Sequence, residues 1–487
     1  MKKDKIASVS LILLVICSIV LTIKIWISEE LWPDGRNFFV STEKILSCLP
    51  FTDEDELEPD AVAPLHETVF KPASIAVSVP GRGRAIYSGG DDAALSELND
   101  ISKIVLSKIF KSDEPGSEVL EEEYSDTLKS RSVLVKYPVS LPTKIVGHMC
   151  EINSSPVFDE VSKIKDFSII PDSATDDAVL VYMHDPAQNR IIKYKANNCR
   201  RLFDNAVSDY GKNDNRFVSA YELGFYKSDI GMEQKVIFDP LVYIDTSSEK
   251  SKTSVITGSS PFDKSEPSEL DVETINRFIS AFGYNPNSVR RYTDNDGTLV
   301  FVENYGTIKL YRNGLLEYTT TTPEKGINMQ IHSEIQDNPQ NTLDAVDCVS
   351  EILGNVWDIL SAGELPDVRL NSTVTDNYSD YKMKFDFRYD GYPIIINTGN
   401  INHAVEFEVK NNRLISLKAY IRSYEAVGSA SENITSLEAL DSFFEELNND
   451  SVASDLFLGY VDYGTNGNIY THWNILSEND EITSLRR

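Results

Sequence analysis

The stretch "YKMKFDFRYDGYPIII", residues 381–396, alternates apolar and polar side chains with a period of two before it turns. The apolar set is Met383, Phe385, Phe387 and Tyr389, and the polar set is Lys382, Lys384, Asp386 and Arg388. Side chains of a β-strand point alternately to its two faces, so the pattern predicts a strand with one dry face. Asp390 and Gly391 tolerate the positive φ of a tight turn. The stretch therefore predicts an antiparallel hairpin whose sheet has one buried and one exposed face.

Two further stretches predict hairpins of the same kind. "FVENYGTIKLYRNGLLEYTTT", residues 301–321, turns at Asn313–Gly314, and "AVEFEVKNNRLISLKAYI", residues 404–421, turns at Asn411–Asn412. In the second stretch we expect the apolar side chains of one strand to oppose those of the other: Val405, Phe407 and Val409 against Ile415, Leu417, Ala419 and Ile421. The C-terminal half is therefore built mainly from antiparallel strands.

A helix precedes each group of hairpins. In residues 268–285, Ser268 can cap a helix with Asp271 three residues later, and an apolar stripe follows: Val272, Ile275, Phe278, Ile279 and Phe282. Residues 342–360 carry a second stripe: Leu343, Val346, Val349, Leu353 and Val356. A helix followed by hairpins, twice, predicts two related modules of an α+β fold with helices packed on one face of each antiparallel sheet.

Residues 61–244 predict a separate α+β domain. Residues 94–110 carry a helical stripe of apolar side chains: Leu95, Leu98, Ile101, Val105 and Ile109. A shorter helix is expected from Cys199 to Gly211. Strands are expected at residues 132–139, 176–185 and 189–196, the last two joined through "PAQ" as a hairpin.

Two polar stretches suggest where the domains begin and end. "TDEDELEPD", residues 52–60, is so acidic that self-repulsion favours an extended stalk, and residues 245–269, rich in Ser, Thr and Lys, predict a linker. The predicted organisation is a cytoplasmic start at 1–5, a transmembrane helix at 6–27, a stalk at 28–60, an extracellular α+β domain at 61–244, a linker at 245–267, and two helix-plus-sheet modules at 268–330 and 331–487.

The run from Ile6 to Ile27 predicts the transmembrane helix, because Lys24 is its only charged residue. At about 1.5 Å per residue the run is about 33 Å long, enough to cross a hydrocarbon core of about 30 Å. Three lysines before it favour a cytoplasmic N-terminus. Lys24, Trp26 and Trp32 are the expected anchors at the membrane interface. The sequence thus predicts a single-pass protein of the cell membrane with the bulk of the chain outside.

A cleavable signal peptide and a lipoprotein are the alternatives for this run. A cleavable signal peptide requires small residues after the apolar core, whereas the chain continues "TIKIWISEELWP". A lipoprotein requires a small residue before the modified cysteine, whereas Ile16 precedes Cys17. Both mismatches favour an anchor that is retained.

The composition indicates a strongly acidic exported part. The formal charge of the chain is −30, and residues 1–27, with four lysines and one aspartate, contribute +3 of it, which leaves −33 for the rest. Such a surface repels nucleic acid and anionic lipid, so no nucleic-acid partner is expected, while basic surfaces and cations stay open. The cysteines after residue 27, at positions 48, 150, 199 and 348, have neither a disulfide-framework nor a CxxC spacing.

Motifs of known catalytic centres are missing. The chain has no HExxH, GxSxG or Walker loop, and the S-x-x-K pair of Ser41 and Lys44 lacks its SDN and KTG companions. "PGRGRAIYSGG", residues 80–90, could form an anion-binding nest, but a glycine-rich surface turn explains it better. We therefore expect no enzyme, with no catalytic residues and no cofactor-binding residues.

Metal ligands are not expected either. "YTDNDGTLVFVE", residues 292–303, places Asp294, Asp296, Gly297 and Glu303 as in a calcium loop, but Tyr292 stands at the first ligand position and a strand follows. A turn at Asp296–Gly297 is favoured, and calcium stays as the alternative. The histidines, at positions 66, 148, 184, 332, 403 and 472, show no ligand spacing.

One face of the predicted transmembrane helix is lined by small and weakly polar side chains. Its residues are Ala7, Ser10, Leu14, Cys17 and Leu21. Small residues allow close helix approach and hydroxyls can bond across, so this face can dock the transmembrane helix of a partner. The alternative is that its serine bonds back to a carbonyl of its own helix.

Several motifs resemble the YycH family of Gram-positive bacteria. "KIASVSLILLVICSIVLTIKIW", residues 5–26, resembles the N-terminus of that family, and "LWPDGRNFF", residues 31–39, resembles its clostridial branch. "FRYDGYPII", residues 387–395, and "AVEFEVKNNRLISL", residues 404–417, are similar to the sheet repeats of YycH and its relative YycI. Residues 61–244 contribute no matching motif.

The resemblance implies a membrane-anchored, non-catalytic protein. Members of the family bind the sensor histidine kinase YycG, also called WalK, of the cell-wall two-component system, so such a kinase, and a YycI-like protein, are the expected partners. The expected function is regulation of that kinase through the transmembrane helix and the extracellular domains. Two other classes stay open: a cell-envelope adhesin or wall-binding module, and a cell-wall hydrolase, which would need a cleft of converging polar groups.

Overall fold

A computed structural model describes most of the chain after residue 68. The described residues are 69–81, 83–88, 92–211, 216–225, 236–329, 338–363, 365–398, 402–446, 451–477 and 482–485. The predicted cytoplasmic start, transmembrane helix and stalk, residues 1–60, lie outside them. No helix within the described ranges has both the length and the apolar character needed to span a bilayer. The described residues fall into two compact units: Asp271–Arg290 belongs to the smaller, and the residues up to Leu270 and from Arg291 onward belong to the larger.

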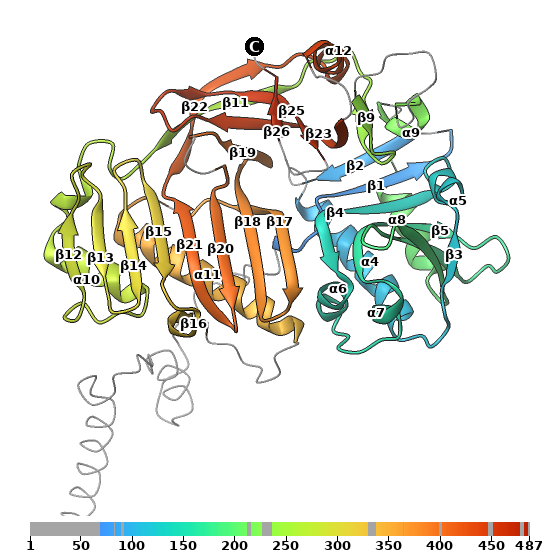
Figure 1. The fold of residues 1–487 in the computed structure, drawn as a ribbon. Coiled ribbons are helices and arrows are strands. Elements are labelled where there is room, and N and C mark those ends of the chain that lie inside the picture. The colour runs from blue at the N-terminus through green and yellow to red at the C-terminus, as the bar shows by residue number, and fades with distance from the viewer. Residues whose placement is uncertain are drawn as a thin grey trace, which may run out of the picture. The chain divides into compact units, whose positions relative to one another are not determined.

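The N-terminal part of the larger unit contains an antiparallel sheet, here called the N-terminal sheet (Figure 1). Its strands lie in the order β2-β1-β4-β5-β6-β7-β3. Their bounds are β1 Ser74–Val79, β2 Gly83–Ser88, β3 Ser117–Val119, β4 Ser132–Pro142, β5 Lys163–Pro171, β6 Val179–Asp185 and β7 Arg190–Ala196. The strands predicted at 132–139, 176–185 and 189–196 are present as β4, β6 and β7, and β6 pairs with β7 as a hairpin.

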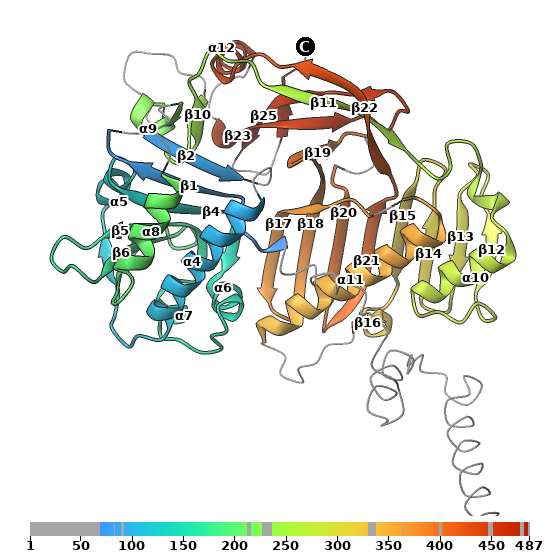
Figure 2. The same cartoon turned by 180° about the vertical axis from the view of Figure 1, so that it is seen from behind.

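Helices accompany this sheet. Their bounds are α4 Asp92–Phe110, α5 Glu121–Thr127, α6 Thr143–Met149, α7 Val157–Glu160, α8 Arg200–Tyr210 and α9 Ala220–Leu223. The long helices α4 and α8 lie together against one face of the sheet (Figure 2). Both were predicted, and α8 ends at Gly211 as expected. The short helix α5 contacts β5 and β7, and its Tyr124, with the C-cap residue Leu128, lies in the same core as Leu134 of β4.

The predicted linker at 245–267 is wrong in part, because its centre is the strand β11 (Lys252–Ser259). This strand pairs with β22 (Ser423–Glu432) and β24 (Asn468–Ile469) in a small sheet. Val255 and Ile256 are buried, and the hydroxyl of Thr253 bonds to that of Thr471 at 2.6 Å. The Ser and Thr residues therefore do not mark a linker here, since a hydroxyl such as that of Thr253 has a partner inside the protein.

The smaller unit contains the helix α10 (Val272–Ala281) within its described residues Asp271–Arg290. Its N-cap is Asp271, whose carboxylate accepts a hydrogen bond from the backbone of Thr274 at 3.0 Å. The predicted cap, Ser268, instead lies in a short 3₁₀ turn, Pro267–Glu269. Of the predicted apolar stripe, Val272 is 58% exposed, and the buried members are Ile275, Phe278, Ile279 and Phe282.

The C-terminal half forms a large mixed sheet, here called the large sheet. Its order is β12-β13-β14-β15-β21-β20-β18-β19-β23-β25-β26, with β16 on β21, β17 on β18 and β9 on β23. The bounds are β9 Val236–Phe238, β12 Arg290–Thr293, β13 Leu299–Val302, β14 Gly306–Leu310, β15 Leu315–Thr320, β16 Ile327–Asn328, β17 Val368–Asn377, β18 Asp380–Tyr389, β19 Tyr392–Ile396, β20 Val405–Lys410, β21 Arg413–Tyr420, β23 Ser451–Asp462, β25 Thr471–Ser477 and β26 Ile482–Ser484. β19 and β9 pair with β23 in parallel, whereas pairs such as β15 with β21 and β18 with β20 are antiparallel.

The two predicted modules do not have separate sheets. β15, from the first, pairs with β21, from the second, with Leu316 opposite Ala419. Pairing at this junction satisfies backbone groups that two separate sheets would expose at their edges. The domain ranges 61–244, 268–330 and 331–487 stay predictions, but strands of each range pair with strands of another. β15 of the second range pairs with β21 of the third, and β9 of the first range pairs with β23 of the third.

The tight turns partly match the sequence. Asp390–Gly391 and Asn411–Asn412 have positive φ at both positions, as predicted. The predicted two-residue turn at Asn313–Gly314 is wrong: Tyr311 bonds to Leu315, so the loop has a third residue, and only Gly314 has a positive φ. This loop is the three-residue hairpin with glycine in the left-handed region.

A β-bulge changes the predicted register of residues 404–421. Val405 and Phe407 oppose Ala419 and Leu417, as predicted. A register shift after Glu408 then places Val409 opposite Leu414 and leaves Ile415 as the extra residue. With a two-residue turn, unbroken pairing would place Phe407 opposite Ser416. The bulge adds one residue to β21 and so brings Leu417 opposite Phe407.

The helix α11 (Pro339–Ile359) lies across the dry face of the large sheet (Figure 2). Every residue of its predicted stripe is buried, from Leu343 to Val356, and Trp357 contacts Phe387 of β18 at 6.2 Å between ring centres. Met383, Phe385 and Phe387 are buried as predicted. The remaining helix α12 (Ser436–Glu446) follows β22.

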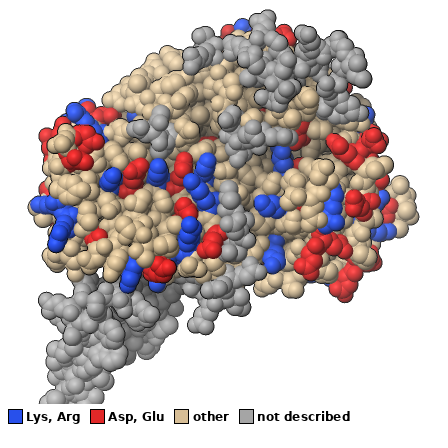
Figure 3. Space-filling view, in the orientation of Figure 1, with Lys and Arg blue, Asp and Glu red and all other residues tan. Residues whose placement is uncertain are grey.

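The other face of the large sheet carries a ladder of alternating charge. Figure 3 shows basic (blue) and acidic (red) side chains side by side on this face. The ladder consists of residues directly opposite on neighbouring strands: Lys309, Glu317, Lys418, Glu406 and Lys384. Glu317 and Lys418 form an ion pair at 3.6 Å. One predicted member of this wet face, Asp386, is instead 4% exposed, because Asn371 donates to it and His403 lies 3.0 Å away. Partners on the sheet therefore allow a charge to be buried.

Candidate functional site

A short segment of the chain, residues 236–245, belongs to two hydrophobic cores at once. We call it the connecting segment; it contains β9 and β10 (Tyr243–Asp245), and β10 pairs with β8 (Phe217–Ser219). Leu241 packs in a core on the α5 side of the N-terminal sheet, with Ala76, Tyr124, Leu128, Leu134, Tyr182 and Ile191. Phe238, Val242 and Ile244 pack in another core, with α12, β23 and β25. The segment therefore ties the N-terminal sheet to the C-terminal elements.

A row of polar residues crosses the N-terminal sheet where it meets this segment. Lys136 of β4 lies opposite Asp166 of β5, which lies opposite His184 of β6. Directly opposed residues point to the same face of a sheet, so the three side chains form one row. The same face carries Leu134 and Tyr182 of the α5-side core. Charged groups are thus placed inside a largely apolar face.

Asp166 is the centre of the row and is 1% exposed. Its carboxylate accepts a hydrogen bond from the hydroxyl of Tyr124 and lies 3.2 Å from Nδ1 of His184. Burial and the charge of Asp166 hold the pKa of Tyr124 well above its usual range. Burial alone would lower the pKa of His184, but the hydrogen bond and charge of Asp166, with the charge of Asp239, outweigh it, and the pKa is raised. Asp166 therefore favours the protonated forms of both neighbours.

Two lysines extend the row to the connecting segment and to β23. Lys165 donates to Asp239 at 3.0 Å, and Lys136 lies 3.6 Å from Asp455 and bonds to the carbonyl of Ser454 at 3.2 Å. Burial would raise the pKa of Asp239, but the charges of Lys165 and Lys136 outweigh it and the pKa is lowered. We call Tyr124, Lys136, Lys165, Asp166, His184, Asp239 and Asp455 together the polar junction.

The charges of the polar junction almost balance. Its two lysines face three aspartates, so a neutral His184 leaves one negative charge in excess and a protonated His184 removes that excess. Two other ion pairs lie around the α5-side core: Arg84 with Glu222 at 2.9 Å, and Lys193 with Glu123 at 2.8 Å. The protonation state of His184 therefore decides the net charge of a buried region.

Arg84 anchors the other end of the connecting segment. Its guanidinium donates to the carbonyl of Leu128 at 2.6 Å and lies over the ring of Tyr243 at 5.0 Å. The side chain is 5% exposed. The stretch "PGRGRAIYSGG" thus contains the β1–β2 turn, with positive φ at Gly81 and Gly83, followed by a buried arginine. The turn was predicted, but the role of Arg84 was missed.

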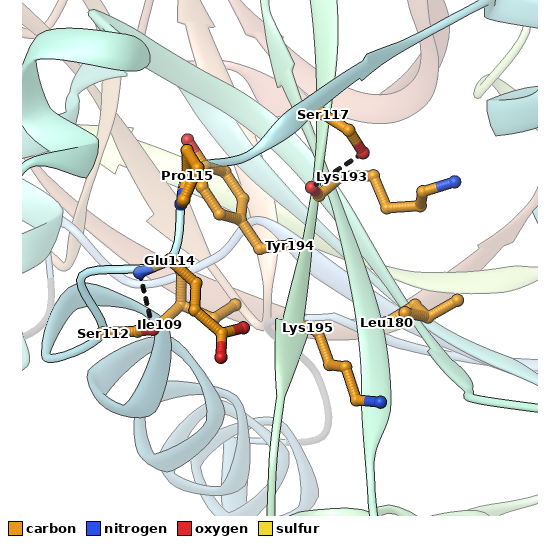
Figure 4. Close-up of a pocket in the computed structure, with 9 residues that line it drawn as sticks. All are labelled: Ile109, Ser112, Glu114, Pro115, Ser117, Leu180, Lys193, Tyr194 and Lys195. Atoms are coloured by element: carbon orange, nitrogen blue, oxygen red, sulfur yellow. Dashed lines mark hydrogen bonds between the residues drawn. The ribbon is translucent and has the colours of Figure 1, made fainter. Parts of the chain in front are cut away.

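A small pocket lies where α4 ends beside β7 (Figure 4). Its volume is about 160 Å³, and its polar lining includes Ser112, Lys193 and Lys195. Both lysines already have partners, since Lys193 pairs with Glu123 and Lys195 pairs with Asp172 at 2.9 Å. The hydroxyl of Ser112 accepts from the backbone of Glu114 at 3.1 Å. Both lysines of the pocket are therefore paired with carboxylates, and no activated nucleophile is present among the residues that line it.

The site residues predicted from the sequence are not placed by the structure. The partner-helix face (Ala7, Ser10, Leu14, Cys17 and Leu21) and the membrane anchors (Lys24, Trp26 and Trp32) all lie outside the described residues, as do Ser41 and Lys44. They stay predictions.

The calcium alternative gains no support from the geometry of its loop. Asp294 bonds by its backbone to Thr298 at 2.8 Å, and the carboxylate of Asp296 accepts from the backbone of Thr298 at 2.9 Å. Gly297 has a positive φ, so the residues form the turn that the sequence favoured. Within the described residues, no group of three His, Cys, Asp or Glu side chains could hold a metal ion.

The described histidines do not lie together. His184 belongs to the polar junction, His403 faces the buried Asp386, His148 bonds to Gln340 of α11, and His472 faces the carbonyl of Leu485. His184 was missed as a site residue although a signal was present. The run "VLVYM" before it is apolar on both faces, which indicates a strand buried on both sides and hence a partly buried His184, as the structure shows.

Comparisons with known proteins identify the fold. No protein-family model and no curated protein matches the chain. The structure, an α+β fold built on antiparallel sheets, is similar to the crystal structure of YycH from Bacillus subtilis, with a TM-score of 0.55. The match covers 89% of this chain and 99% of that chain at 13% sequence identity. The chain therefore has a YycH-like fold, and the fold implied by the sequence resemblance is confirmed.

Proposed function

We propose that this chain is a membrane-anchored, non-catalytic regulator of a sensor histidine kinase of the WalK (YycG) type. The observation that carries the proposal is the YycH-like fold, which extends over 89% of the chain. The N-terminal and C-terminal motifs that resemble the YycH family support it, because members of that family bind this kinase. Regulation of this kind needs binding surfaces rather than a catalytic centre.

The anchor is part of the proposed mechanism. Residues 6–27 would span the cell membrane with the N-terminus in the cytoplasm, so that residues 28–487 lie outside. A shared membrane raises the effective concentration of the regulator beside the kinase without any new contact. The regulator then changes kinase output only if it binds two kinase states unequally, alone or with a YycI-like partner.

The first test measures kinase output in the bacterium that makes this protein. Three chains are compared in a strain that lacks the native one: the full chain, the chain with residues 6–27 replaced by an unrelated spanning helix, and residues 28–487 exported behind a cleavable signal. The readout is the phosphorylated fraction of the response regulator. We expect the full chain to restore the native level and the exported, unanchored chain to fail.

The second test asks which face of the helix touches a partner. A photoreactive residue is placed at Ser10 or Cys17, with Ile12 and Ile19 as matched controls about 180–200° away on the helix. We expect crosslinks to the kinase from Ser10 and Cys17 and far fewer from the controls. Equal crosslinking from both faces, with unchanged output after the helix is replaced, contradicts a role for this face.

Other outcomes would point to the two alternative classes. An adhesin or wall-binding module keeps its function when residues 6–27 are replaced and binds purified wall without the kinase. A hydrolase releases soluble fragments from wall material. Either result, together with native kinase output in the strain that lacks the protein, overturns the proposed function.

A further inference from the structure

The connecting segment is held on the N-terminal sheet by charged groups that lie close together. Lys165 binds Asp239 within the segment, and Lys136 binds Asp455 on β23 beside it, where the backbone of Asp239 also bonds to Ala453 at 2.8 Å. Lys136 lies on the same face of the sheet as Asp166 and His184, and the charge of Lys165 also acts on His184. A change of charge at His184 therefore acts on the groups that hold the segment.

Among the groups of the polar junction, His184 is the one that is expected to change charge near neutral pH. Asp166 and Lys165 face it from β5, Tyr124 from α5 and Asp239 from the connecting segment, with Lys136 on β4 and Asp455 on β23 beyond them. On β7 the opposing residue is Ile191, which carries no charge. Lysine, aspartate and tyrosine ordinarily titrate far from neutral pH, whereas histidine titrates near about 6.5.

Burial makes the excess charge costly. Asp166 is 1% exposed, and the side chains of Lys136 and Asp239 are 12% and 16% exposed. An unbalanced charge in such surroundings is poorly screened by solvent, so it weakens the contacts of the groups nearest to it. The pairs Arg84–Glu222 and Lys193–Glu123 cannot absorb the excess, because each is already balanced.

We propose that His184 and the polar junction form a proton-operated latch on the connecting segment. With His184 protonated, the junction is balanced and the segment is held between its two cores. With His184 neutral, the excess negative charge loosens residues 236–245 from the N-terminal sheet. The latch is a property of the fold and does not depend on the proposed function.

The direction of the pH dependence follows from the raised pKa of His184. Stabilisation by a raised pKa is fully present below about pH 6.5, the ordinary pKa of histidine, and is lost as the pH rises through the pKa of the folded state. The latch is therefore closed in mildly acidic surroundings and opens toward alkaline pH.

The test follows hydrogen–deuterium exchange of residues 236–245 in the full chain, held in nanodiscs of uncharged lipid, between about pH 5.5 and about pH 8.5. Rates are normalised to the intrinsic rate at each pH. In the native sequence we expect protection of these residues to fall several-fold across the range, while residues 405–420 of the large sheet keep theirs. Constant protection of residues 236–245 overturns the proposal without any variant.

Three variants separate the latch from a general effect of pH. His184→Gln should lower protection at acidic pH and remove its pH dependence. The double variant His184→Gln, Asp455→Asn restores the balance of charge and should recover protection at every pH. His148→Gln is the matched control, since His148 faces the amides of Gln340 and Asn153 rather than a carboxylate, and it should keep the native profile. A lost profile in His148→Gln, or no recovery in the double variant, overturns the proposal.

Discussion

Arg422 illustrates how single residues at the end of β21 are fixed by their neighbours. The side chain is 1% exposed and pairs with Asp462, which is fully buried, at 2.9 Å. It also donates to the carbonyls of Gly258 at 3.0 Å and Thr465 at 2.6 Å. Tyr424 donates to the same carboxylate at 2.9 Å, and burial, with the charge of Asp462, holds the pKa of Tyr424 well above its usual range. A buried ion pair is tolerated here because several polar groups surround it.

Gly258 is required next to this arginine for reasons of space. A Cβ at position 258 would lie 2.7 Å from the guanidinium of Arg422. We expect Gly258→Ala to lower the free energy of unfolding by about 1–3 kcal/mol, as overpacking does. Gly354→Ala in α11 is the matched control, since nothing lies within 4 Å of its added Cβ, and it should raise stability by about 0.5–1 kcal/mol. Urea unfolding measures both, and equal effects contradict this explanation.

Thr253 makes a second prediction at the residue scale. Its hydroxyl bonds to Thr471 at 2.6 Å and accepts from the side-chain amide of Asn433 at 3.0 Å. Thr253→Val keeps the shape but removes these bonds, and it should cost about 1–3 kcal/mol of unfolding free energy. The same change at the exposed Thr319 of β15 should stay within about 0.5 kcal/mol. Urea unfolding of both variants checks the comparison, and a neutral Thr253→Val shows that the buried bonds add nothing.

At the scale of elements, the exposed face of the large sheet is polar because side chains of opposite charge alternate from one strand to the next. The inner charges Glu317, Lys418 and Glu406 face opposite charges on both neighbouring strands. The end charges, Lys309 on β14 and Lys384 on β18, face one on a single side. Opposed charges on a sheet stabilise each other modestly and disfavour a shift in register, which would separate pairs such as Glu317 and Lys418. The ladder therefore helps to fix how the strands of the two predicted modules join.

Reversal of one charge in the ladder tests this role. Glu317→Lys places like charges opposite Lys309 and Lys418 and removes the bond from Tyr311 at 2.7 Å. We expect the free energy of unfolding to fall by about 0.5–2 kcal/mol at low salt, and by less at high salt. Glu317→Gln, the neutral control, should lose less than half as much. Urea unfolding at two salt concentrations measures this, and no dependence on salt contradicts an electrostatic cause.

At the scale of the whole molecule, the net charge of −30 affects the stability of the fold. Self-repulsion of so many like charges destabilises a compact state, and salt screens it over a Debye length of about 8 Å at about 0.15 M. The connecting segment also affects the whole molecule, because its residues pack both in the core on the α5 side and in the core on the α12 side. Local unfolding of this segment is therefore expected to weaken both cores together.

Salt should accordingly stabilise the protein. We expect the midpoint of thermal unfolding of the full chain in nanodiscs of uncharged lipid to rise by several degrees from about 0.02 M to about 0.5 M NaCl. An uncharged osmolyte at the same osmolality serves as the control for effects other than screening. A midpoint that falls with NaCl would mean that the ion pairs of the molecule outweigh its self-repulsion.

The alternating and helical patterns of the sequence decided much of the local structure. The hairpins at residues 381–396 and 404–421, the stripe of α11 and the helix ending at Gly211 all follow from side-chain period and turn chemistry, which act over a few residues. The resemblance of residues 5–39 and 387–417 to the YycH family pointed to the fold that the structure confirms. The polar row was missed because period-two alternation assigns Asp166 and His184 to a face without showing what covers it.

What covers that face was decided by the tertiary structure alone. The pairing of β15 with β21, the strand in the predicted linker and the polar junction bring together residues far apart in the chain, such as Lys136 and Asp455. Such contacts depend on which strand edges and apolar faces meet when the chain is compact. A polar residue is therefore buried or exposed according to its distant partners, and its own neighbours in the sequence carry no record of them.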